Sequence, residues 1–410
     1  MRSVQDQLAA VLTVVGPVAP LEVVLADAVG CILAVDVVAE RNVPAFAVAA
    51  QDGYAVSSAD TSQAGPGLPL HLPVVHDVHV GAPAPLRLVP GYAVRIASGA
   101  PLPVGADAVV PLDQTDRGTA RVLVPQPTAP GDHVRRAGVD ARVGEVVLTA
   151  GSRLGARQVA LAAAIGRGRV TVHPTPRVVV LSIGDELTDP GSAPRDGLVH
   201  DANGPALVSA VIDTGAAAIR IGVVGDDRAL LREVIEDQMV RADLIITTGG
   251  LSESTLDTVK DVIASLGTVR FDHVAMTPGH LQGYGHVGGG DEAQRGVPIF
   301  ALPGHPVAAY VSFEVFVRPV LRSIAGRPEL FRPSVAAVAT QGWPSPAGLR
   351  QFVPALLTGS PDTGYRVTPI GDPGELSISA LARANALAVV PERDGAVHAG
   401  DRVHCLVLEG

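Results

Sequence analysis

Four short segments in the middle of the chain combine glycine with acidic, hydroxyl or imidazole side chains, and each directly follows an apolar run. They comprise residues 184–186, 225–227, 249–252 and 303–306. Glycine lets backbone N–H groups approach an anion, and a helix that follows adds the positive end of its dipole. Ser252 adds a hydroxyl donor. Together these segments indicate a site for a phosphorylated ligand, whereas any one of them alone is as well explained by a tight turn.

Carboxylates accompany these glycines. Carboxylates beside a phosphate usually imply a divalent cation, and Mg²⁺ is a hard ion that prefers such oxygen ligands. The candidate ligands are Asp185, Glu186, Asp227 and Asp257. An aspartate just before a helix also often caps that helix, and the pair Asp226 and Asp227 fits capping as well as it fits metal binding. Both interpretations stay open from the sequence.

Other common catalytic and metal-binding patterns are missing from the sequence. The 12 histidines are scattered and show no H-E-x-x-H or similar ligand spacing, which argues against a structural zinc site. There is no Gly-x-Ser-x-Gly elbow, Walker A motif or kinase signature. Cys31 and Cys405 lie far apart in apolar, strand-like contexts, so we expect two buried small side chains without a disulfide.

The four glycine-containing segments lie in a region, residues 176 to about 325, whose sequence predicts alternating strands and helices. Such an alternation implies βαβ units and a doubly wound, mostly parallel sheet. Ligands of such sheets bind in the crevice beyond the carboxyl ends of the strands, where all four segments would open. The predicted strands are 177–182, 217–224, 243–248 and 299–302, and the predicted helices are 204–214, 228–241, 255–266 and 307–324.

The regions on either side are richer in short strands. Residues 45–140 alternate short Val and Leu runs with Gly and Pro, and residues 330–410 return to short strands, so both are predicted to be β-rich modules. Helices are predicted at 1–20 and 158–165, and the glycine-rich stretch 285–296 is expected to be an exposed loop. The predicted fold class is therefore α/β plus β.

Length and composition limit the function further. The 410 residues predict about two to four domains, and 47% hydrophobic against 18% charged residues excludes a mainly disordered chain. The net charge of −10 argues against nucleic acid as a partner. The sequence has no window of 18 uncharged apolar residues, so we expect no membrane span and a cytoplasmic protein. Lys260 is the only lysine, so lysine-based phosphate binding is almost unavailable.

Several segments occur along the chain in the order found in one protein family. The chain resembles the MoeA/gephyrin family, the molybdopterin molybdenumtransferases. Residues 46–56 resemble the segment that begins domain II of that family, and residues 96–115 resemble the next signature. Further matching segments are 182–187, 201–203, 247–257, 278–279, 302–308 with 313–319, and 381–387.

The resemblance implies an elongated homodimer whose chain has four subdomains. These are subdomain I from residues 1–44 and 141–175, the β-rich subdomain II from 45–140, the molybdopterin-binding α/β subdomain III from 176–326, and the β subdomain IV from 327–410. The family reaction takes adenylylated molybdopterin and molybdate, and Mg²⁺-assisted hydrolysis releases AMP as molybdenum enters the dithiolene. The site would lie between subdomain III of one protomer and parts of the other. A molybdopterin adenylyltransferase is a possible partner.

The same resemblance assigns roles to residues of this chain. The catalytic residues would be Glu186, Asp227 and Asp257, and these three with Asp185 would be the Mg²⁺ ligands. Asp140 also falls within a matched signature. The predicted substrate-binding residues are Asp52, Ser98, Gly249, Gly250, Ser252, Pro278, Gly279, His280, Pro303, Gly304, His305 and Pro306.

The chain departs from the family where molybdate would bind. The usual Lys-Pro-Gly-Lys-Pro motif is Thr-Pro-Gly-His-Leu at residues 277–281, so both lysines are replaced. Ala47 stands at an acidic family position, Glu253 adds an acid near the anion site, and His305 replaces an asparagine. Losing one cationic donor to a dianion in a partly dry pocket would cost on the order of a few kcal/mol. Each ~1.4 kcal/mol is tenfold in rate.

Two functional hypotheses therefore stay open from the sequence. The first is an active molybdopterin molybdenumtransferase of divergent sequence, because the acidic and glycine-rich segments are kept. The second is a catalytically degenerate, gephyrin-like scaffold that binds peptide tails of partner proteins, for example those of the bacterial cell-division machinery. A third, intermediate possibility is a protein that binds adenylylated molybdopterin without inserting the metal.

Overall fold

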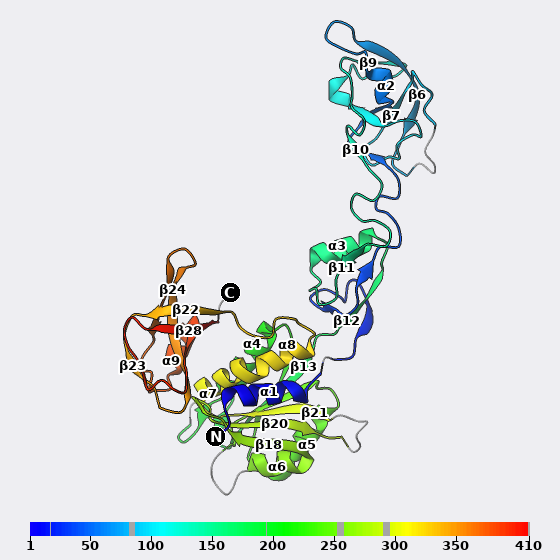
Figure 1. The fold of residues 1–410 in the computed structure, drawn as a ribbon. Helices are drawn as coiled ribbons and strands as arrows, with labels where there is room; N and C mark the ends of the chain where they lie inside the picture. The colour runs from blue at the N-terminus through cyan, green and yellow to red at the C-terminus, as the bar shows by residue number, and fades with distance from the viewer. Residues whose placement is uncertain (17, 82–86, 194, 252–257, 290–295, 409–410) are drawn as a thin grey trace. The chain divides into compact units, whose positions relative to one another are not determined.

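The computed structural model describes residues 1–16, 18–81, 87–193, 195–251, 258–289 and 296–408 (Figure 1). The chain divides into two compact units. One consists of Met1–Leu21, Gly30–Ala34 and Val172–Gly410, and the other of Glu22–Val29 and Val35–Thr171. We call them the α/β–barrel unit and the β-rich unit.

A six-stranded sheet forms the centre of the α/β–barrel unit. Its first four strands are parallel to one another. The fifth strand is antiparallel to both of its neighbours, the fourth and the sixth. Runs such as Val178–Leu181 are buried on both faces, as expected where helices cover both sides of a parallel sheet. In spatial order the strands are β16 (Ala217–Val224), β13 (Arg177–Ile183), β17 (Leu244–Thr248), β21 (Val297–Leu302), β20 (Leu281–Val287) and β18 (Gly267–His273).

Helices cover both faces of this sheet (Figure 1). Successive strand residues point to opposite faces, so Val178 and Val180 pack against one helical layer while Val179 and Leu181 pack against the other. The first layer contains α1 (Val4–Val14), α4 (Asn203–Asp213), α7 (Pro306–Ser312), a π-helical segment (Phe313–Val317) and α8 (Arg318–Ile324). The second layer contains α5 (Arg228–Met239) and α6 (Thr258–Leu266).

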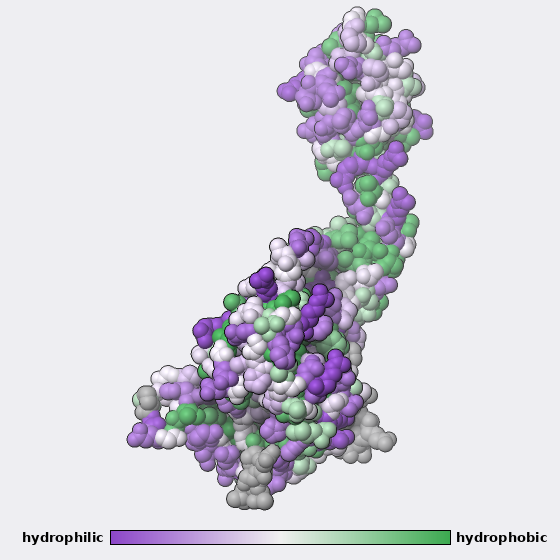
Figure 2. Space-filling view, turned by 60° about the vertical axis from the view of Figure 1, so that its left-hand side comes forward, coloured by the Kyte–Doolittle hydropathy of each residue, from purple (hydrophilic) through white to green (hydrophobic). Residues whose placement is uncertain are grey.

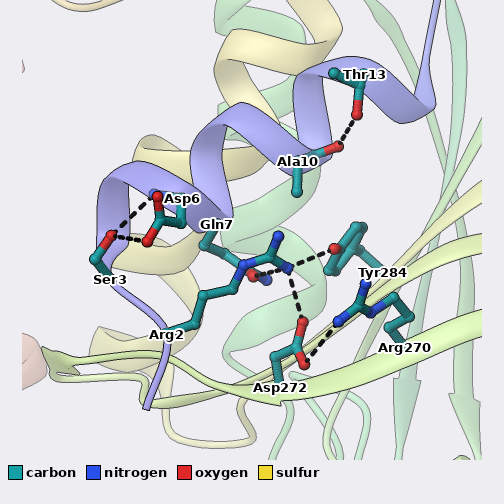
Figure 3. A network of polar contacts seen from close by, with 9 residues as sticks. All are labelled: Arg2, Ser3, Asp6, Gln7, Ala10, Thr13, Arg270, Asp272 and Tyr284. Carbon is teal, nitrogen blue, oxygen red and sulfur yellow. Dashed lines mark hydrogen bonds and ion pairs between the residues drawn. The ribbon is translucent and has the colours of Figure 1, made fainter.

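Arg2 fastens the N-terminal helix to the sheet (Figure 3). Its guanidinium Nη1 donates to Asp272 Oδ2 at 3.0 Å and to the Tyr284 hydroxyl at 2.8 Å, which joins the start of α1 to β18 and β20. The Ser3 hydroxyl accepts a hydrogen bond from the backbone N–H of Asp6 and caps α1. The helix predicted over residues 1–20 ends at Val14, because the backbone is already extended at Val15.

The glycine-rich stretch at 285–296 is not a loop throughout, contrary to the sequence prediction. Its first residues belong to β20, which pairs with both β18 and β21. The glycines there permit close packing instead of a turn. A Cβ on Gly285 would lie 2.7 Å from Val269 Cα of the neighbouring strand β18. Residues 290–295 lie outside the described part of the chain.

The C-terminal strands close into a barrel within the same unit. The strand order is β19 (Met276–Thr277), β24 (Arg350–Ser360), β25 (Gly364–Pro369), β22 (Ser334–Ala339), β28 (Arg402–Val407) and β26 (Ala386–Val390), and β26 pairs back onto β24. Strands β24, β25, β22, β28 and β26 form the closed ring, and β19 pairs with β24 at its side. Cys405 is fully buried in this barrel and Cys31 is buried too, as expected of small apolar side chains. The remaining elements here are β23 (Trp343–Pro344), β27 (Ala396–Val397) and α9 (Ile378–Arg383).

The β-rich unit contains a five-stranded sheet with its own buried core. In spatial order its strands are β8 (Ala108–Pro111), β5 (Gly53–Val56), β7 (Ala93–Ile96), β6 (Leu70–Val78) and β9 (Arg121–Val124). Shorter elements of this unit are β3 (Val37–Val38), β4 (Val48–Ala49), α2 (Ser58–Thr61), a 3₁₀ helix (Leu112–Gln114), β10 (Val134–Arg135), β11 (Val146–Leu148) and α3 (Ala156–Ala164). Elsewhere in the chain, β1 (Leu21–Val24) and β2 (Ile32–Leu33) pair with β12 (Arg169–His173). Within the α/β–barrel unit, β14 (Leu187–Thr188) pairs with β15 (Val199–His200).

None of the helices in the described residues is long and apolar enough to cross a membrane.

Candidate active site at the carboxyl edge of the sheet

The four glycine-rich segments follow strands β13, β16, β17 and β21, which are mutually parallel neighbours. Their first residues therefore meet at one edge of the sheet, as the sequence predicted. The loops after β13 and β16 are joined directly by two hydrogen bonds. The backbone N–H of Asp185 donates to Asp226 Oδ2 at 3.3 Å, and the N–H of Asp226 donates to Asp185 Oδ1 at 3.0 Å. A Cβ on Gly225 would lie 2.7 Å from Asp185 Oδ1, so glycine permits this approach.

Asp227 caps helix α5. Its Oδ1 accepts a hydrogen bond from the backbone N–H of Leu230 at 2.8 Å. The capping interpretation of this aspartate is therefore confirmed, and its other carboxylate oxygen is not used by that bond. The carboxylate of Glu186 lies over Gly184, where any side chain on the glycine would collide with it. These carboxylates thus lie on neighbouring loops at the same edge.

The described residues contain no group of three or more His, Cys, Asp or Glu side chains that could hold a metal ion by themselves. Asp257 and Ser252, both predicted site residues, lie outside the described residues. Mg²⁺ commonly keeps several waters and takes one or two protein carboxylates together with substrate phosphates. The loops after β13 and β16 supply that smaller number of carboxylates.

Asn203 joins the loops after β17 and β21. Its side-chain Nδ2 donates to Thr248 Oγ1 at 2.8 Å and to the backbone carbonyl of Gly304 at 2.7 Å. The Thr248 hydroxyl in turn donates to the carbonyl of Pro303 at 2.9 Å. Asn203 lies in the segment 201–203, which resembles a family signature, but no role could be assigned to it from the sequence. A polar residue at the start of a helix, after an extended stretch, indicates in the sequence that its side chain could have a role there. It does not indicate that the two acceptors are Thr248 Oγ1 and the Gly304 carbonyl.

A cavity of about 410 Å³ opens beside these loops. Pro278, Gly279 and His280 line it from the segment after β19, and Pro303 and His305 line it from the loop after β21. The structure thus brings together two groups of predicted substrate-binding residues that are distant in sequence. The other lining residues are Leu251, Thr277, Leu281, Ala308 and Leu376, so the described lining contains histidine but no lysine, arginine or carboxylate.

Neighbouring elements fix both sides of the cavity. Thr277 pairs with Gln351 of the barrel strand β24, which holds the start of the 277–281 segment. Gly279 has φ +91°, and a Cβ there would lie 2.6 Å from Ser312 Oγ. On the other side, His305 Nδ1 accepts a hydrogen bond from the backbone N–H of Val307 at 3.3 Å. In the neutral imidazole this bond places the proton on Nε2, which is then a hydrogen-bond donor.

Asp52 and Ser98 lie together on the β-rich unit. The Ser98 backbone N–H donates to Asp52 Oδ1 at 2.7 Å, and the Ser98 hydroxyl donates to the Ala50 carbonyl at 3.1 Å. Both residues are exposed to solvent. Asp140, from a separate matched signature, is paired with Arg135 instead.

Models of three protein regions match this chain in succession. The MoeA N-terminal region (domain I and II) matches residues 2–166, a probable molybdopterin binding domain matches 179–323, and the MoeA C-terminal region (domain IV) matches 336–408. The fold is similar over 100% of this chain to a solved molybdopterin biosynthesis MoeA protein from Pyrococcus horikosii, with a TM-score of 0.83 and 30% identity over 99% of that chain. The chain belongs to the MoeA family.

Relatives within the MoeA family match over nearly the full length. Molybdopterin molybdenumtransferase 2 of Mycobacterium tuberculosis is 41% identical over 409 residues, which cover 98% of each chain. Molybdopterin molybdenumtransferase 1 of the same organism is 40% identical, covering 100% of this chain and 99% of the relative. The molybdopterin molybdenumtransferase of Bacillus subtilis is 31% identical, covering 94% and 89%.

Proposed function

We propose that this protein is a molybdopterin molybdenumtransferase that acts in molybdenum cofactor biosynthesis. It inserts molybdenum from molybdate into adenylylated molybdopterin and releases AMP. The observation that carries the proposal is the meeting of the glycine-rich loops and the 277–281 segment at one edge of the sheet, in a chain whose full-length relatives bear this name. That full-length similarity favours the enzyme over a peptide-binding scaffold.

We assign the phosphate side of the substrate to the loops after β13, β16 and β17. Backbone N–H groups around Gly249 and Gly250 suit an anion, since both glycines have positive φ and a side chain at either would collide with a neighbour. Glu186, Asp227 and Asp257 are the proposed catalytic residues. With Asp185 they are the proposed Mg²⁺ ligands, one or two at a time, and the bound cation would neutralise charge on the departing phosphate.

We assign the molybdate side to the cavity lined by Pro278, Gly279, His280 and His305. An oxyanion there meets imidazole and backbone donors in place of lysine. The Nε2–H of His305 supplies one donor, because its Nδ1 accepts the hydrogen bond from the Val307 N–H. Neutral donors stabilise an anion less than charged ones do. The account therefore predicts an active enzyme whose use of molybdate is weaker than that of a lysine-bearing site.

The remaining assignments follow the family resemblance. Asp52 and Ser98 are proposed to bind substrate from the β-rich unit, and the protein is proposed to act as a homodimer in the cytoplasm. Figure 2 shows hydrophobic surface on the part of the β-rich unit that carries α3 and β11. Val35, Val143 and Val146 are exposed on or beside the paired strands β3 and β11. Exposed apolar groups of this kind suit a protein interface.

The proposed function is tested by incubating the purified full-length protein with adenylylated molybdopterin and Mg²⁺, with and without molybdate, and measuring AMP. The proposal predicts AMP release that depends on both molybdate and Mg²⁺, and loss of release in Glu186→Gln. The control is Glu329→Gln, an exposed residue at 81% side-chain exposure far from these loops in sequence. Tight substrate binding without AMP release would overturn the enzymatic assignment, and absence of both would favour the scaffold.

A further inference from the structure

The hydrogen bonding of the Asn203 side chain is not what a purely structural role would require. It is 8% exposed, and Nδ2 uses both of its hydrogens, one on Thr248 Oγ1 and one on the Gly304 carbonyl. Its Oδ1 is buried without a hydrogen-bond partner. The amide cannot be turned around to satisfy Oδ1, because the Gly304 carbonyl is only an acceptor and must face Nδ2.

A side chain that leaves a buried acceptor unpaired is a poor stabiliser, and such local conflicts concentrate where function requires a particular geometry. The geometry that Asn203 sets is the spacing of two loops. Thr248 directly precedes Gly249, and Gly304 directly precedes His305. The loops are already close, because a Cβ on Gly304 would lie 3.4 Å from Gly249 Cα.

We propose that Asn203 is a positioning residue: it clamps the loop after β17 to the loop after β21 and so places the Gly249 and Gly250 N–H groups relative to His305. The proposal rests on the proposed function for its catalytic consequence, but the clamp itself is a property of the folded protein. Without it, the hydrogen bond from the Thr248 hydroxyl to the Pro303 carbonyl is left to link the two loops, and their relative position is less tightly fixed. Misplacing reacting groups by about 1 Å costs on the order of 100-fold in rate.

The first test compares Asn203→Ala with Asn385→Ala. Asn385 is a matched control, because its side chain also bridges backbone groups, donating to the Leu357 carbonyl and accepting from the Leu357 N–H, but it does so in the barrel. Asn203→Ala should lower kcat/KM for AMP release about 10- to 100-fold. Asn385→Ala should lower the melting temperature and leave kcat/KM within about twofold. Equal losses of kcat/KM in the two variants would overturn the proposal.

The second test does not need activity. Amide hydrogen exchange in Asn203→Ala should become faster at residues 249–251 and at Gly304 and His305, and should stay unchanged in β13 and β16. Thr248→Val removes the same link and should give the same pattern, and Thr248→Ser, which keeps the hydroxyl, should restore slow exchange. If the wild-type protein released no AMP, this pattern would still establish the clamp. Faster exchange across the whole sheet, or unchanged exchange at both loops, would refute it.

Discussion

Arg332 holds the buried carboxylate of Glu314 by two hydrogen bonds, from Nε to Oε2 and from Nη2 to Oε1, each 2.9 Å long. Glu314 lies in the π-helical segment, and Arg332 lies between α8 and the barrel strand β22. Arg332 Nη1 also donates to the Leu408 carbonyl at 2.7 Å. These contacts therefore join the helical layer of the sheet to the barrel, whose β19 leads into the 277–281 segment of the cavity.

Glu314 is the acidic partner of two arginines in this described cluster, since Arg318 Nε also lies 3.7 Å from Oε2. Its hydrogen bonds raise the pKa of Arg332, whereas burial lowers the pKa of Arg318. Glu314→Gln should lower the free energy of unfolding by about 3–5 kcal/mol, because it leaves buried guanidinium groups without their counter-charge. Urea unfolding measures this. Glu329→Gln, at a carboxylate that is 81% exposed although its partner Arg322 is largely buried, should change it by less than about 1 kcal/mol. A similar small change for Glu314→Gln would contradict the account.

We expect the folded protein to lose stability in acid because of Asp201. Burial by itself would raise the pKa of its carboxyl, but hydrogen bonds from the Gly204 N–H and the Arg220 guanidinium outweigh burial and lower it. A depressed folded-state pKa contributes stability that is fully present above the unfolded pKa of about 3.9 and is lost as the pH falls through the folded value. Asp201→Asn should therefore cost about 2 kcal/mol at pH 7.

The pH dependence separates this charge effect from simple packing. The difference in unfolding free energy between wild type and Asp201→Asn should shrink steadily below pH 4. Denaturant unfolding at a series of pH values measures it. A difference that stayed constant from pH 7 into acid would show that the Asp201 charge is not what stabilises the fold.

Cys405 should be an unreactive thiol in the native protein. Burial in the barrel raises its pKa to about 11, and the thiolate is the nucleophile. Iodoacetamide at pH 8 should leave Cys405 unmodified until the protein is unfolded in guanidinium chloride, when it should react fully. Mass spectrometry of peptides follows the modification. Rapid labelling of Cys405 in the folded protein would mean that the barrel opens far more readily than its closed strand pairing implies.

We expect that introducing lysines into the cavity lined by His280 increases activity. Replacing Thr277 and His280 by lysine places two cations in a lining whose described residues carry none. The double variant Thr277→Lys/His280→Lys should increase the rate of molybdate-dependent metal insertion, because each ~1.4 kcal/mol of added transition-state stabilisation is tenfold in rate. The rate at limiting molybdate is the measurement. No gain in a folded double variant would mean that the missing lysines do not limit this enzyme.

Much of the fold could be predicted from local patterns. β16 was expected at 217–224 and is Ala217–Val224. β13 extends only one residue beyond its predicted end, because its long β-branched run is typical of a buried strand. β18 and β20 were not predicted. Gly283 and Gly285 resemble turn residues in sequence, whereas in the fold they allow close approach of neighbouring strands, which depends on partners distant in the chain.

The candidate site was predictable in its loops but not in its connections. Topology alone brings segments after parallel strands to one edge, so the neighbouring positions of Asp185 and Asp226 follow from the strand pattern. The cavity between residues 278–280 and His305 could be expected only through the family resemblance, because it depends on how the barrel strand β24 holds Thr277. The Asn203 bonds depend on tertiary packing, so no local pattern reveals them.

The most direct test of the central claim is to measure molybdenum in the pterin product. The full-length protein is incubated with adenylylated molybdopterin, Mg²⁺ and molybdate, the pterin is separated from protein, and its molybdenum is determined by mass spectrometry. The account predicts molybdenum and molybdopterin in equal amounts, formed together with AMP, and neither AMP nor metallated pterin in Glu186→Gln. Pterin that binds but carries no molybdenum after complete reaction would contradict it.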